Sequence, residues 1–346
     1  MQVTCRVRRV SHWRTSAFGG SNMAIDPRNG FLTLSDNALV ALDIPVSEVC
    51  DVVEAAVLGS AEGRVHTTPK SAIVPGTGRY MMTTLSTADD PGRTVVKSVM
   101  VSPRNPARGL QATEGVIIVQ DSETGRLLAV MEAGWVTAVR TAALSAVAAK
   151  RLANPNSTTI GFVGAGVQSR SHLSAMADLF PLKRVHIFSR GMANMERLRD
   201  YARGMGLDAV ICDGPEQALR HSDIVVSSVT LSFEMEPFLD ANWLKPGAFA
   251  AITDAAGPWF PASIDRFGAI CIDDLEQERT TPNPMVPLDL VGTDLPGLVA
   301  GHVKMGFDPD KPSAFIFRGM AVGDFAVAAM ALEKAQAAGI GTAANW

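Results

Sequence analysis

A glycine-rich segment could hold the phosphates of a nucleotide. Residues 160–169 read Ile-Gly-Phe-Val-Gly-Ala-Gly-Val-Gln-Ser, which predicts an apolar strand, a tight turn and the start of a helix. Gly164 permits the turn, and Gly166 lets backbone N–H groups approach a pyrophosphate at the helix N-terminus. Ser169 stands where the dinucleotide-binding pattern has glycine or alanine. We interpret the segment as a dinucleotide-binding turn; a glycine-rich turn in a fold that binds another ligand is the alternative.

The residues at the end of the next expected strand, near Phe188, indicate which cofactor is preferred. Sites that prefer NAD place an Asp or Glu there, which binds the ribose 2′-hydroxyl. This chain has Phe188-Ser189-Arg190 instead. An uncharged hydroxyl followed by arginine suits a 2′-phosphate, so we expect NADP(H), with NAD(H) possible. An ordinary surface role for Arg190 is the alternative.

A lysine inside an apolar strand is a second candidate for chemistry. Lys97 lies in Thr94-Val-Val-Lys-Ser-Val-Met. A lysine is costly in such a strand unless it has a buried partner. The position therefore indicates either a functional lysine or a structural, edge-strand residue.

Two regions of different pattern must position these residues. Residues 71–130 read as short strands separated by turns, without intervening helices, which predicts an antiparallel or mixed sheet. An alanine-rich helix is expected over Thr137–Leu152. From Thr158 onward strands and helices alternate, as in a doubly wound parallel sheet, and a last helix, Met320–Ala338, is expected to pack back on the first region.

Composition limits the class of protein. A chain of 346 residues favours two domains, and a net charge of −4 gives no basic field for nucleic acid or anionic lipid. No apolar run approaches the roughly 20 residues that cross a bilayer, so no membrane segment is expected. The four cysteines are scattered and form no metal-binding pattern, which favours a reducing, cytoplasmic setting and no metal site.

The first residues differ from the rest. Residues 1–25 carry four arginines and no acidic residue before Asp26. We expect residues 1–28 to be a disordered tail or the product of a start codon assigned too early, with Met23 as the true start. A transit-type leader is the alternative, but no amphipathic apolar face is evident.

With the cofactor motif placed, residues 31–340 resemble the ornithine cyclodeaminase/mu-crystallin family. The most specific piece is Thr137-Ala-Val-Arg-Thr-Ala-Ala, followed by the alanine-rich helix and Gly164-Ala-Gly-Val-Gln-Ser. Also similar are Leu34-Ser-Asp, Glu62-Gly-Arg, Val96-Lys, Asn105-Pro, Asp121 with Thr124-Gly, and Gly319-Met-Ala-Val-Gly-Asp.

The resemblance implies a fold and an assembly. The fold class is α/β: a Rossmann doubly wound parallel sheet plus a second α+β domain for substrate binding and dimerisation, built from both chain ends. We therefore expect the second domain over residues 29–138 and 322–346, the Rossmann domain over residues 139–321, and a homodimer.

The resemblance also implies site residues. Arg64 and Lys97 match the substrate-carboxylate positions, and a guanidinium suits a carboxylate because it forms two parallel hydrogen bonds. A solvated role after Gly63 is the alternative for Arg64. Thr113 and Arg140 match cofactor-contacting positions, with Arg140 able to meet a phosphate or the substrate carboxylate. The cofactor residues expected are Thr113, Arg140, Gly164, Gly166, Val167, Gln168, Ser189, Arg190, Thr230 and Gly319.

One position departs from the family. The cyclodeaminases carry an Asp shortly after the strand that corresponds to Phe249–Thr253, and it handles the substrate amine. Ungapped counting from the glycine-rich turn places that position on Ala256. The nearest acid is Asp254, so either a local shift brings Asp254 into the site as a catalytic residue, or the chain lacks this acid.

These observations favour an NAD(P)H-dependent enzyme that transfers hydride at the α-carbon of a small α-imino or α-amino acid, as ketimine and pyrroline-2-carboxylate reductases do. Lys97 or Asp254 would manage the proton. Ornithine cyclodeamination with a recycled NAD is the first alternative. A non-catalytic protein of the mu-crystallin type, which binds NADPH or a small ligand, is the second.

Overall fold

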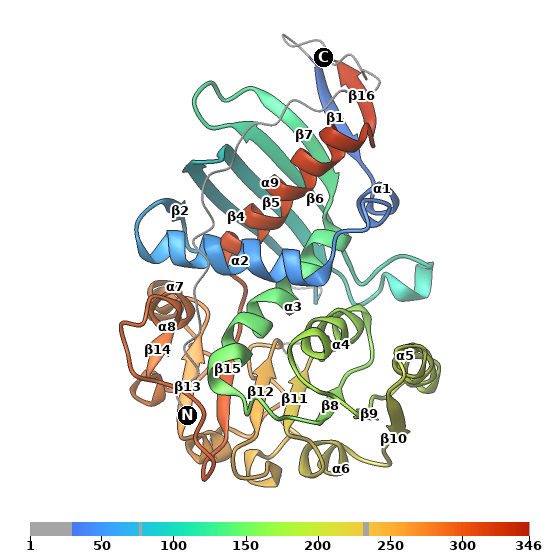
Figure 1. Cartoon of the computed structure of the whole chain (residues 1–346), viewed down its shortest axis with the longest axis vertical. Helices are drawn as coiled ribbons and strands as arrows, with labels where there is room; N and C mark the ends of the chain where they lie inside the picture. Colours follow the sequence, from blue (N-terminus) through green and yellow to red (C-terminus); the bar gives the residue numbers. More distant parts are fainter. Residues whose placement is uncertain (1–29, 76–77, 231–234, 346) are drawn as a thin grey trace.

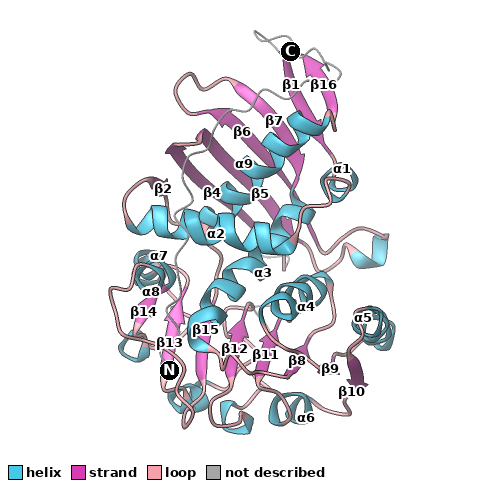
Figure 2. Cartoon of the chain, in the orientation of Figure 1, coloured by secondary structure: helices cyan, strands magenta, loops and turns pink. Residues whose placement is uncertain are grey.

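The computed structural model describes residues 30–75, 78–230 and 235–345, which form two eight-stranded sheets (Figures 1 and 2). The expectations for residues 1–28 and for Met23 lie outside the described residues.

The first sheet is mixed, as its turn-separated strands predicted. Its order is β16-β1-β7-β6-β5-β4-β2, with β3 also paired to β4. Only the β1–β7 pairing is parallel among those described. The strands are β1 (Gly30–Leu34), β2 (Val65–Thr67), β3 (Ser71–Ile73), β4 (Tyr80–Asp89), β5 (Gly92–Val101), β6 (Thr113–Asp121), β7 (Leu127–Glu132) and β16 (Thr342–Asn345).

Helices cover one face of this sheet, as Figure 1 shows. They are α2 (Val46–Ala61), α3 (Ala133–Leu152) and α9 (Ala321–Ala338), beside the short α1 (Asp36–Val40). Helix α9 contacts β4 and β5, so the last helix does return to the first sheet. Side chains alternate between the faces of a strand, and the register aligns Thr84, Lys97, Ile117 and Met131 in one row across β4–β7. This row is buried beneath the helices.

The second sheet is parallel throughout, in the order β10-β9-β8-β11-β12-β15-β13-β14. Figure 1 shows α3 and α4 on one side of the strands and α6 on the other. This is the doubly wound arrangement that the alternating pattern predicted. The strands are β8 (Thr159–Val163), β9 (Arg184–Phe188), β10 (Asp208–Ile211), β11 (Ile224–Ser227), β12 (Phe249–Ile252), β13 (Ala269–Ile272), β14 (Thr293–Asp294) and β15 (Ser313–Ile316). The helices are α4 (Val167–Leu179), α5 (Met192–Gly204), α6 (Pro215–Arg220), α7 (Leu275–Thr280) and α8 (Leu295–Val299).

Two elements differ from the sequence-based expectation for a tertiary reason. Helix α3 begins at Ala133 rather than Thr137, because the Trp135 N–H donates to Asp36 Oδ1 at 2.8 Å. A residue almost 100 positions away thus caps the helix, which local sequence cannot show. Strand β16 was not expected, and it forms by antiparallel pairing with β1.

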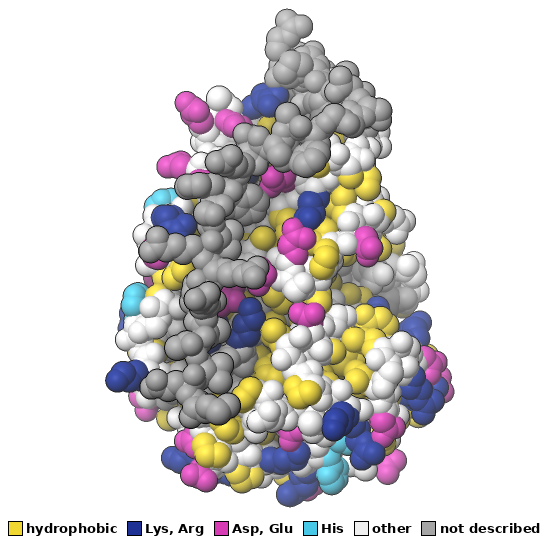
Figure 3. All heavy atoms as spheres, in the orientation of Figure 1, with side chains coloured by type: hydrophobic (Ala, Val, Ile, Leu, Met, Phe, Trp, Pro, Cys, Tyr) yellow, Lys and Arg dark blue, Asp and Glu magenta, His cyan; other side chains and the backbone are white. Residues whose placement is uncertain are grey.

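No described helix is both long and apolar enough to cross a bilayer. On the described part of the face in Figure 3, Lys and Arg side chains are interspersed with Asp and Glu rather than gathered in one basic patch.

Gly161 sets the distance between β8 and α6. A Cβ added there would lie 2.4 Å from the Ala218 carbonyl oxygen and 2.5 Å from Ser222 Oγ. The helix backbone therefore packs closer to the strand than any side chain allows.

We expect Gly161→Ala to lower the free energy of unfolding by about 1–3 kcal/mol, as overpacking does. Urea unfolding followed by circular dichroism measures this. Gly204→Ala is the matched control, because nothing lies within 4 Å of its added Cβ and alanine favours a helix. Equal stability of the two variants would contradict the packing argument.

Candidate active site

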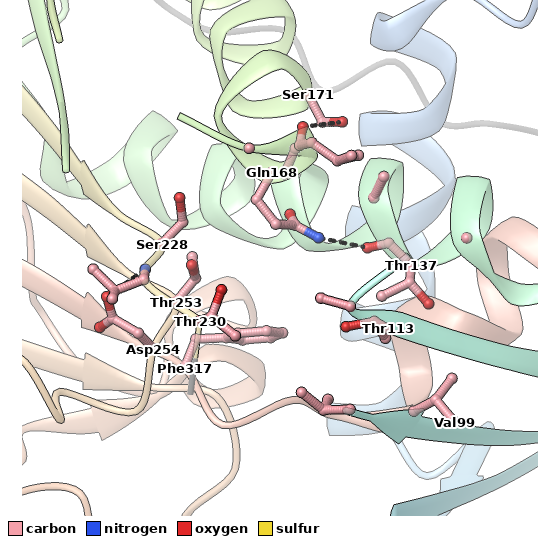
Figure 4. Close-up of a pocket in the computed structure, with 18 of the residues that line it drawn as sticks. Val99, Thr113, Thr137, Gln168, Ser171, Ser228, Thr230, Thr253, Asp254 and Phe317 are labelled. Atoms are coloured by element: carbon pink, nitrogen blue, oxygen red, sulfur yellow. Dashed lines mark hydrogen bonds between the residues drawn. The ribbon is translucent and has the colours of Figure 1, made fainter. Parts of the chain in front are cut away.

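A large open cavity lies between the two sheets. Its volume is about 1780 Å³, above the roughly 300–1,000 Å³ of ordinary ligand pockets, so it has room for a dinucleotide and a small substrate together. Figure 4 shows the carboxyl ends of the parallel strands on one side, with Thr253 and Asp254, and Val99 and Thr113 of the first sheet on the other. Ligands bind at this edge of open α/β sheets.

The glycine-rich turn forms one wall of the cavity. Gly164 has φ +100°, and an added Cβ would lie 2.6 Å from the Ser228 carbonyl oxygen, so only glycine fits. At Gly166, which opens α4, an added Cβ would meet nothing within 4 Å. Backbone N–H groups of the turn can therefore be reached by a phosphate from the open side.

Unpartnered polar atoms lie beside this turn. Gln168 and Thr137 both line the cavity, and the Gln168 Nε2 donates to the Thr137 carbonyl oxygen at 3.5 Å (Figure 4). Gln168 Oε1 and Thr137 Oγ1 are buried and have no hydrogen-bond partner. Buried polar groups are normally satisfied, so these two atoms fit a bound polar ligand, as a dinucleotide is. Val167, Thr113 and Thr230 also line the cavity.

The residues expected to select the cofactor lie apart from the cavity lining. The Ser189 N–H donates to Met195 Sδ at 3.1 Å, and Arg190 is exposed. Among the described residues, the arginines that line the cavity are Arg170, Arg197 and Arg318. Arg197 lies on α5, one turn past Asn194, and it was not singled out from the sequence because nothing in a surface helix distinguishes it from a solvated arginine.

A buried group of charges lies behind the cavity wall. Lys97 Nζ lies 2.7 Å from Asp324 Oδ1, and Arg140 Nε lies 2.9 Å from the same oxygen. Thr84 Oγ1 donates to Asp324 Oδ2 at 3.0 Å. Asp324 is therefore the partner that a buried Lys97 needs.

This group carries one net positive charge. Burial and the nearby Arg140 lower the pKa of Lys97 to about 8, against the attraction of Asp324. Burial alone would raise the pKa of Asp324, but Arg140 and Lys97 outweigh burial and hold it below its usual value. Arg140 Nη1 is buried without a hydrogen-bond partner, and the guanidinium lies 5.3 Å from the ring centre of Phe317, which lines the cavity. An anion placed here would gain a donor and a positive field.

Lys70, which the sequence analysis missed, reaches the cavity directly. Its Nζ donates to the Arg318 carbonyl oxygen at 2.6 Å and lies 5.7 Å from the ring centre of Tyr80. Gly319 lies at this corner with φ +116°, a conformation that favours glycine, and a Cβ added to it would lie 3.4 Å from Lys70 Nζ. No sequence signal marked Lys70, which follows a proline before the short β3 and is held by the Gln277 side chain from 207 positions away.

The structure places Arg64 apart from the cavity lining. Its side chain is 62% exposed and pairs with Glu62. It follows the end of α2, as the solvated alternative predicts, and its carboxylate role stays a prediction.

Asp254 lines the cavity but has both oxygens engaged. Ser227 Oγ donates to Oδ1 and the Val229 N–H donates to Oδ2, each at 3.1 Å. Burial raises the pKa of Asp254 to about 6, against these two hydrogen bonds. Ala255 and Ala256 follow with φ of 53° and 58°, a left-handed conformation that alanine rarely adopts. The position expected for a cyclodeaminase acid therefore presents an alanine to the cavity.

We expect Asp324→Asn to lower the free energy of unfolding by about 3–5 kcal/mol, because two buried cations lose their shared anion. Urea unfolding at pH 7 measures the change. Glu216→Gln is the control, since its pair with Arg220 is half exposed and such pairs contribute about 1 kcal/mol or less. A small, equal loss in both variants would contradict the importance of the buried group.

Comparison with known proteins gives a consistent group of relatives. The model of the ornithine cyclodeaminase/mu-crystallin family matches residues 33–339. The ketimine reductase mu-crystallin of Macropus fuliginosus is 31% identical over 232 residues, which cover 66% of this chain and 70% of that protein.

Solved structures that resemble this chain are enzymes of the same kind as its sequence relatives. The Δ1-pyrroline-2-carboxylate reductase of Thermococcus litoralis, in complex with NADH and L-proline, superimposes with a TM-score of 0.82 at 25% identity, covering 90% of this chain and 99% of that one. An archaeal alanine dehydrogenase dimer with bound NAD gives a TM-score of 0.83 at 26% identity, covering 92% and 99%.

Proposed function

Because the chain belongs to the ornithine cyclodeaminase/mu-crystallin family, we propose that it is an NAD(P)-dependent oxidoreductase that acts on the C–N bond of a small α-imino or α-amino acid. The proposal rests on one observation. The glycine-rich turn, whose backbone N–H groups can bind a phosphate, faces a positively charged wall across the same cavity. The relatives described above, a ketimine reductase, a pyrroline-2-carboxylate reductase and an alanine dehydrogenase, act on this class of substrate.

Each wall of the cavity has a separate task in this reaction. The turn around Gly166 and the side chain of Gln168 would hold the dinucleotide, with Thr113, Val167 and Thr230 beside it. A bound reduced nicotinamide supplies hydride to the carbon of the C=N bond. Lys70, with the net charge of the Lys97 group behind it, would hold the substrate carboxylate and orient the α-carbon. Arg140 would support both tasks from behind Phe317, because its guanidinium adds positive charge beside the cavity and its Nη1 has no hydrogen-bond partner.

The carboxylates of the cavity favour the reductase over the cyclodeaminase. Cyclodeamination needs an acid aligned with the substrate amines. The carboxylates among the described lining residues are Asp36, Asp43, Glu114 and Asp254. Asp36 and Glu114 accept backbone N–H groups, as Asp254 does. We therefore propose that Asp254 fixes the ends of β11 and β12 rather than serving as the cyclodeaminase acid.

The choice of cofactor rests on the end of β9. Arg190 is the second residue after this strand. The strand lies beside β8 in the sheet, and dinucleotide folds bind the ribose from its end. Its exposed side chain has no carboxylate neighbour in the preceding Phe188-Ser189. We propose NADP(H) as the preferred cofactor, with NAD(H) as the second.

Arg190→Ala should weaken NADPH binding by about 1–3 kcal/mol and leave NADH binding unchanged, since only the 2′-phosphate contact is lost. Nucleotide fluorescence titrations measure both affinities. Arg203→Ala, at the far end of α5, is the control. Arg197→Ala belongs in the same series, because Arg197 lines the cavity. Equal loss for both nucleotides in Arg190→Ala, or a native preference for NADH, would overturn the assignment.

A second experiment separates the two reactions. Pyrroline-2-carboxylate, or an open α-imino acid formed from an α-keto acid and ammonia, should consume NADPH stoichiometrically, whereas L-ornithine with catalytic NAD⁺ should release little ammonia or proline. Absorbance at the nicotinamide band and an ammonia assay follow the two reactions. Rapid ammonia release without net cofactor change would establish the cyclodeaminase instead. Absence of both activities would favour a non-catalytic, ligand-binding protein of the mu-crystallin type.

Lys97→Met should nearly abolish turnover because it removes the positive field behind the substrate, while NADPH affinity stays intact. Steady-state kinetics and nucleotide titration measure the two effects. Unchanged kinetics would reduce Lys97 to a structural residue.

We also propose that the uncovered face of the first sheet forms a homodimer interface. The register aligns Leu85, Val96, Ile118 and Val130 in one row across β4–β7, on the face opposite the helices. Leu85 is 40% exposed, and the neighbouring Met81 and Val116 are similarly open. Contiguous apolar surface of this kind marks an association site.

In this proposal residues 29–138 and 322–346 form the substrate and dimerisation domain, and residues 139–321 form the Rossmann domain.

Light scattering at micromolar concentration should give twice the chain mass of 36.6 kDa. Leu85→Glu should shift the protein toward monomer, because it places charges in the buried centre of the interface. Val210→Glu, an equally exposed valine on the edge strand β10, should leave the mass unchanged. A native protein that is a stable, active monomer would contradict the proposal.

The buried, unpaired Cys50, Cys212 and Cys271 fit a reducing compartment, and we propose a cytoplasmic location.

A further inference from the structure

We propose that Lys70 is the proton donor of the reduction: its ammonium gives a proton to the substrate nitrogen while hydride adds to the carbon. The inference rests on the proposed function. It assigns to Lys70 a catalytic task beyond the attraction of a carboxylate.

The position of Lys70 meets the geometric requirement for an acid. It lines the cavity and is partly buried, whereas Lys97 and Arg140 are sealed behind the wall and do not line it. Among the described residues, the Arg318 carbonyl oxygen accepts a hydrogen bond from its Nζ at 2.6 Å. An ammonium has three N–H donors, so two remain to meet a substrate. The carbonyl fixes the direction of the side chain without neutralising its charge.

The charges around Lys70 come from every element packed against it. Arg318 lies beside it, Lys97 lies on β5, Arg140 on α3 and Tyr80 on β4, and Asp273 follows β13. Burial lowers the pKa of Lys70 to about 7, and Arg140, Lys97 and Arg318 add to this against the attraction of Asp273. Such a group is part protonated at neutral pH, which suits an acid that must give up its proton and regain it.

Other described groups in the cavity or behind its wall are less suited to the task. Asp254 has both oxygens engaged, and Asp273 Oδ2 accepts the N–H groups of Arg318 and Gly319 at 3.0 and 2.6 Å. Burial raises the pKa of the Tyr80 phenol, which makes it a weaker acid. Lys97 is bound to Asp324 at 2.7 Å.

The reaction balances with these groups. The hydride and its electron pair pass from the reduced nicotinamide to the imine carbon, and the C=N π pair moves to nitrogen. Nitrogen takes one proton from the Lys70 ammonium, which becomes a neutral amine. Water then returns a proton to Lys70. The nicotinamide is oxidised and the imine is reduced to the amine.

The test compares Lys70→Arg and Lys70→Met in the full-length protein, with pyrroline-2-carboxylate and NADPH. In the native enzyme, kcat/KM for reduction should fall as pH rises through about 7, because Lys70 loses the proton that it must donate. Arginine keeps its charge at all these pH values and is a poor acid. Lys70→Arg should therefore lower kcat by roughly 100-fold or more, as loss of a general acid does, remove the fall near pH 7, and leave KM within a few-fold.

The remaining variants separate proton transfer from charge. Lys70→Met should lose kcat in the same way and should also raise KM, because the cation is gone. Neither variant should change NADPH affinity. Lys183→Arg and Lys183→Met, at an exposed lysine before β9, are the matched controls and should behave as the native protein. A Lys70→Arg enzyme with native kcat, or with the same fall near pH 7, would overturn the inference, since the fall would then belong to the substrate imine.

Amine labelling tests the same group without turnover. Acetylation of the native protein by acetic anhydride, read by mass spectrometry, should show Lys70 reacting with a midpoint near pH 7, far below the pKa of about 10.4 of a lysine in a model peptide. A Lys70 midpoint near that model-peptide value would overturn the inference. Failure of the native enzyme to reduce any imino acid would instead overturn the proposed function, so the two failures are distinguishable.

Discussion

The shared use of one carboxylate by two buried cations constrains the rest of this structure. Asp324 comes from the last helix, Lys97 from the middle of the first sheet and Arg140 from the helix that leads into the Rossmann sheet. Three segments that are far apart in the sequence must therefore meet at one oxygen atom. A buried ion pair contributes little net stability, but removal of one partner is costly, so the group fixes the relative placement of the three segments more than it strengthens the fold.

The placement of these three segments determines which polar and charged groups face the cavity from each side. The side of the first sheet carries the Lys97 group and Lys70, and the side of the parallel sheet carries backbone N–H groups around Gly166 and the unpartnered oxygen of Gln168. The cations of one side and the backbone N–H groups of the other both favour anions, but of different size and shape, whereas the Gln168 oxygen can accept a hydrogen bond from a donor of the ligand. Donors in a fixed turn suit a pyrophosphate, whereas flexible lysines suit a small carboxylate. An α-imino acid beside a dinucleotide satisfies both sides at once.

The sequence could predict those features of the fold and the site that depend on residues close together in the chain. The glycine turn, the alternating elements and the need of Lys97 for a buried partner each follow from a short segment, and the structure has them. Lys70 could not be found this way, because Gln277 and Arg318, more than 200 positions away, hold it at the cavity beside the pairing of β3 with β4. The surroundings of Arg64 could not be found this way either: its residue type suits a carboxylate, and in the structure it follows the end of α2, 62% exposed and paired with Glu62. Helix α3 likewise begins early because Asp36 caps it from a distance.

The loop after β12 holds the ends of β11 and β12 in place at the edge of the cavity. Two consecutive alanines in the left-handed region cost free energy, and such strain persists only where surrounding contacts enforce it. Asp254 supplies those contacts, because it accepts hydrogen bonds from Ser227 and Val229 at the end of β11, and Trp259 Nε1 donates to Ser227 Oγ at 3.0 Å. A carboxylate with both oxygens held in this way has little freedom to move toward a substrate amine. Burial of this held carboxylate raises its pKa to about 6, and in the proposed reaction the acid–base chemistry is assigned to the cations of the opposite wall.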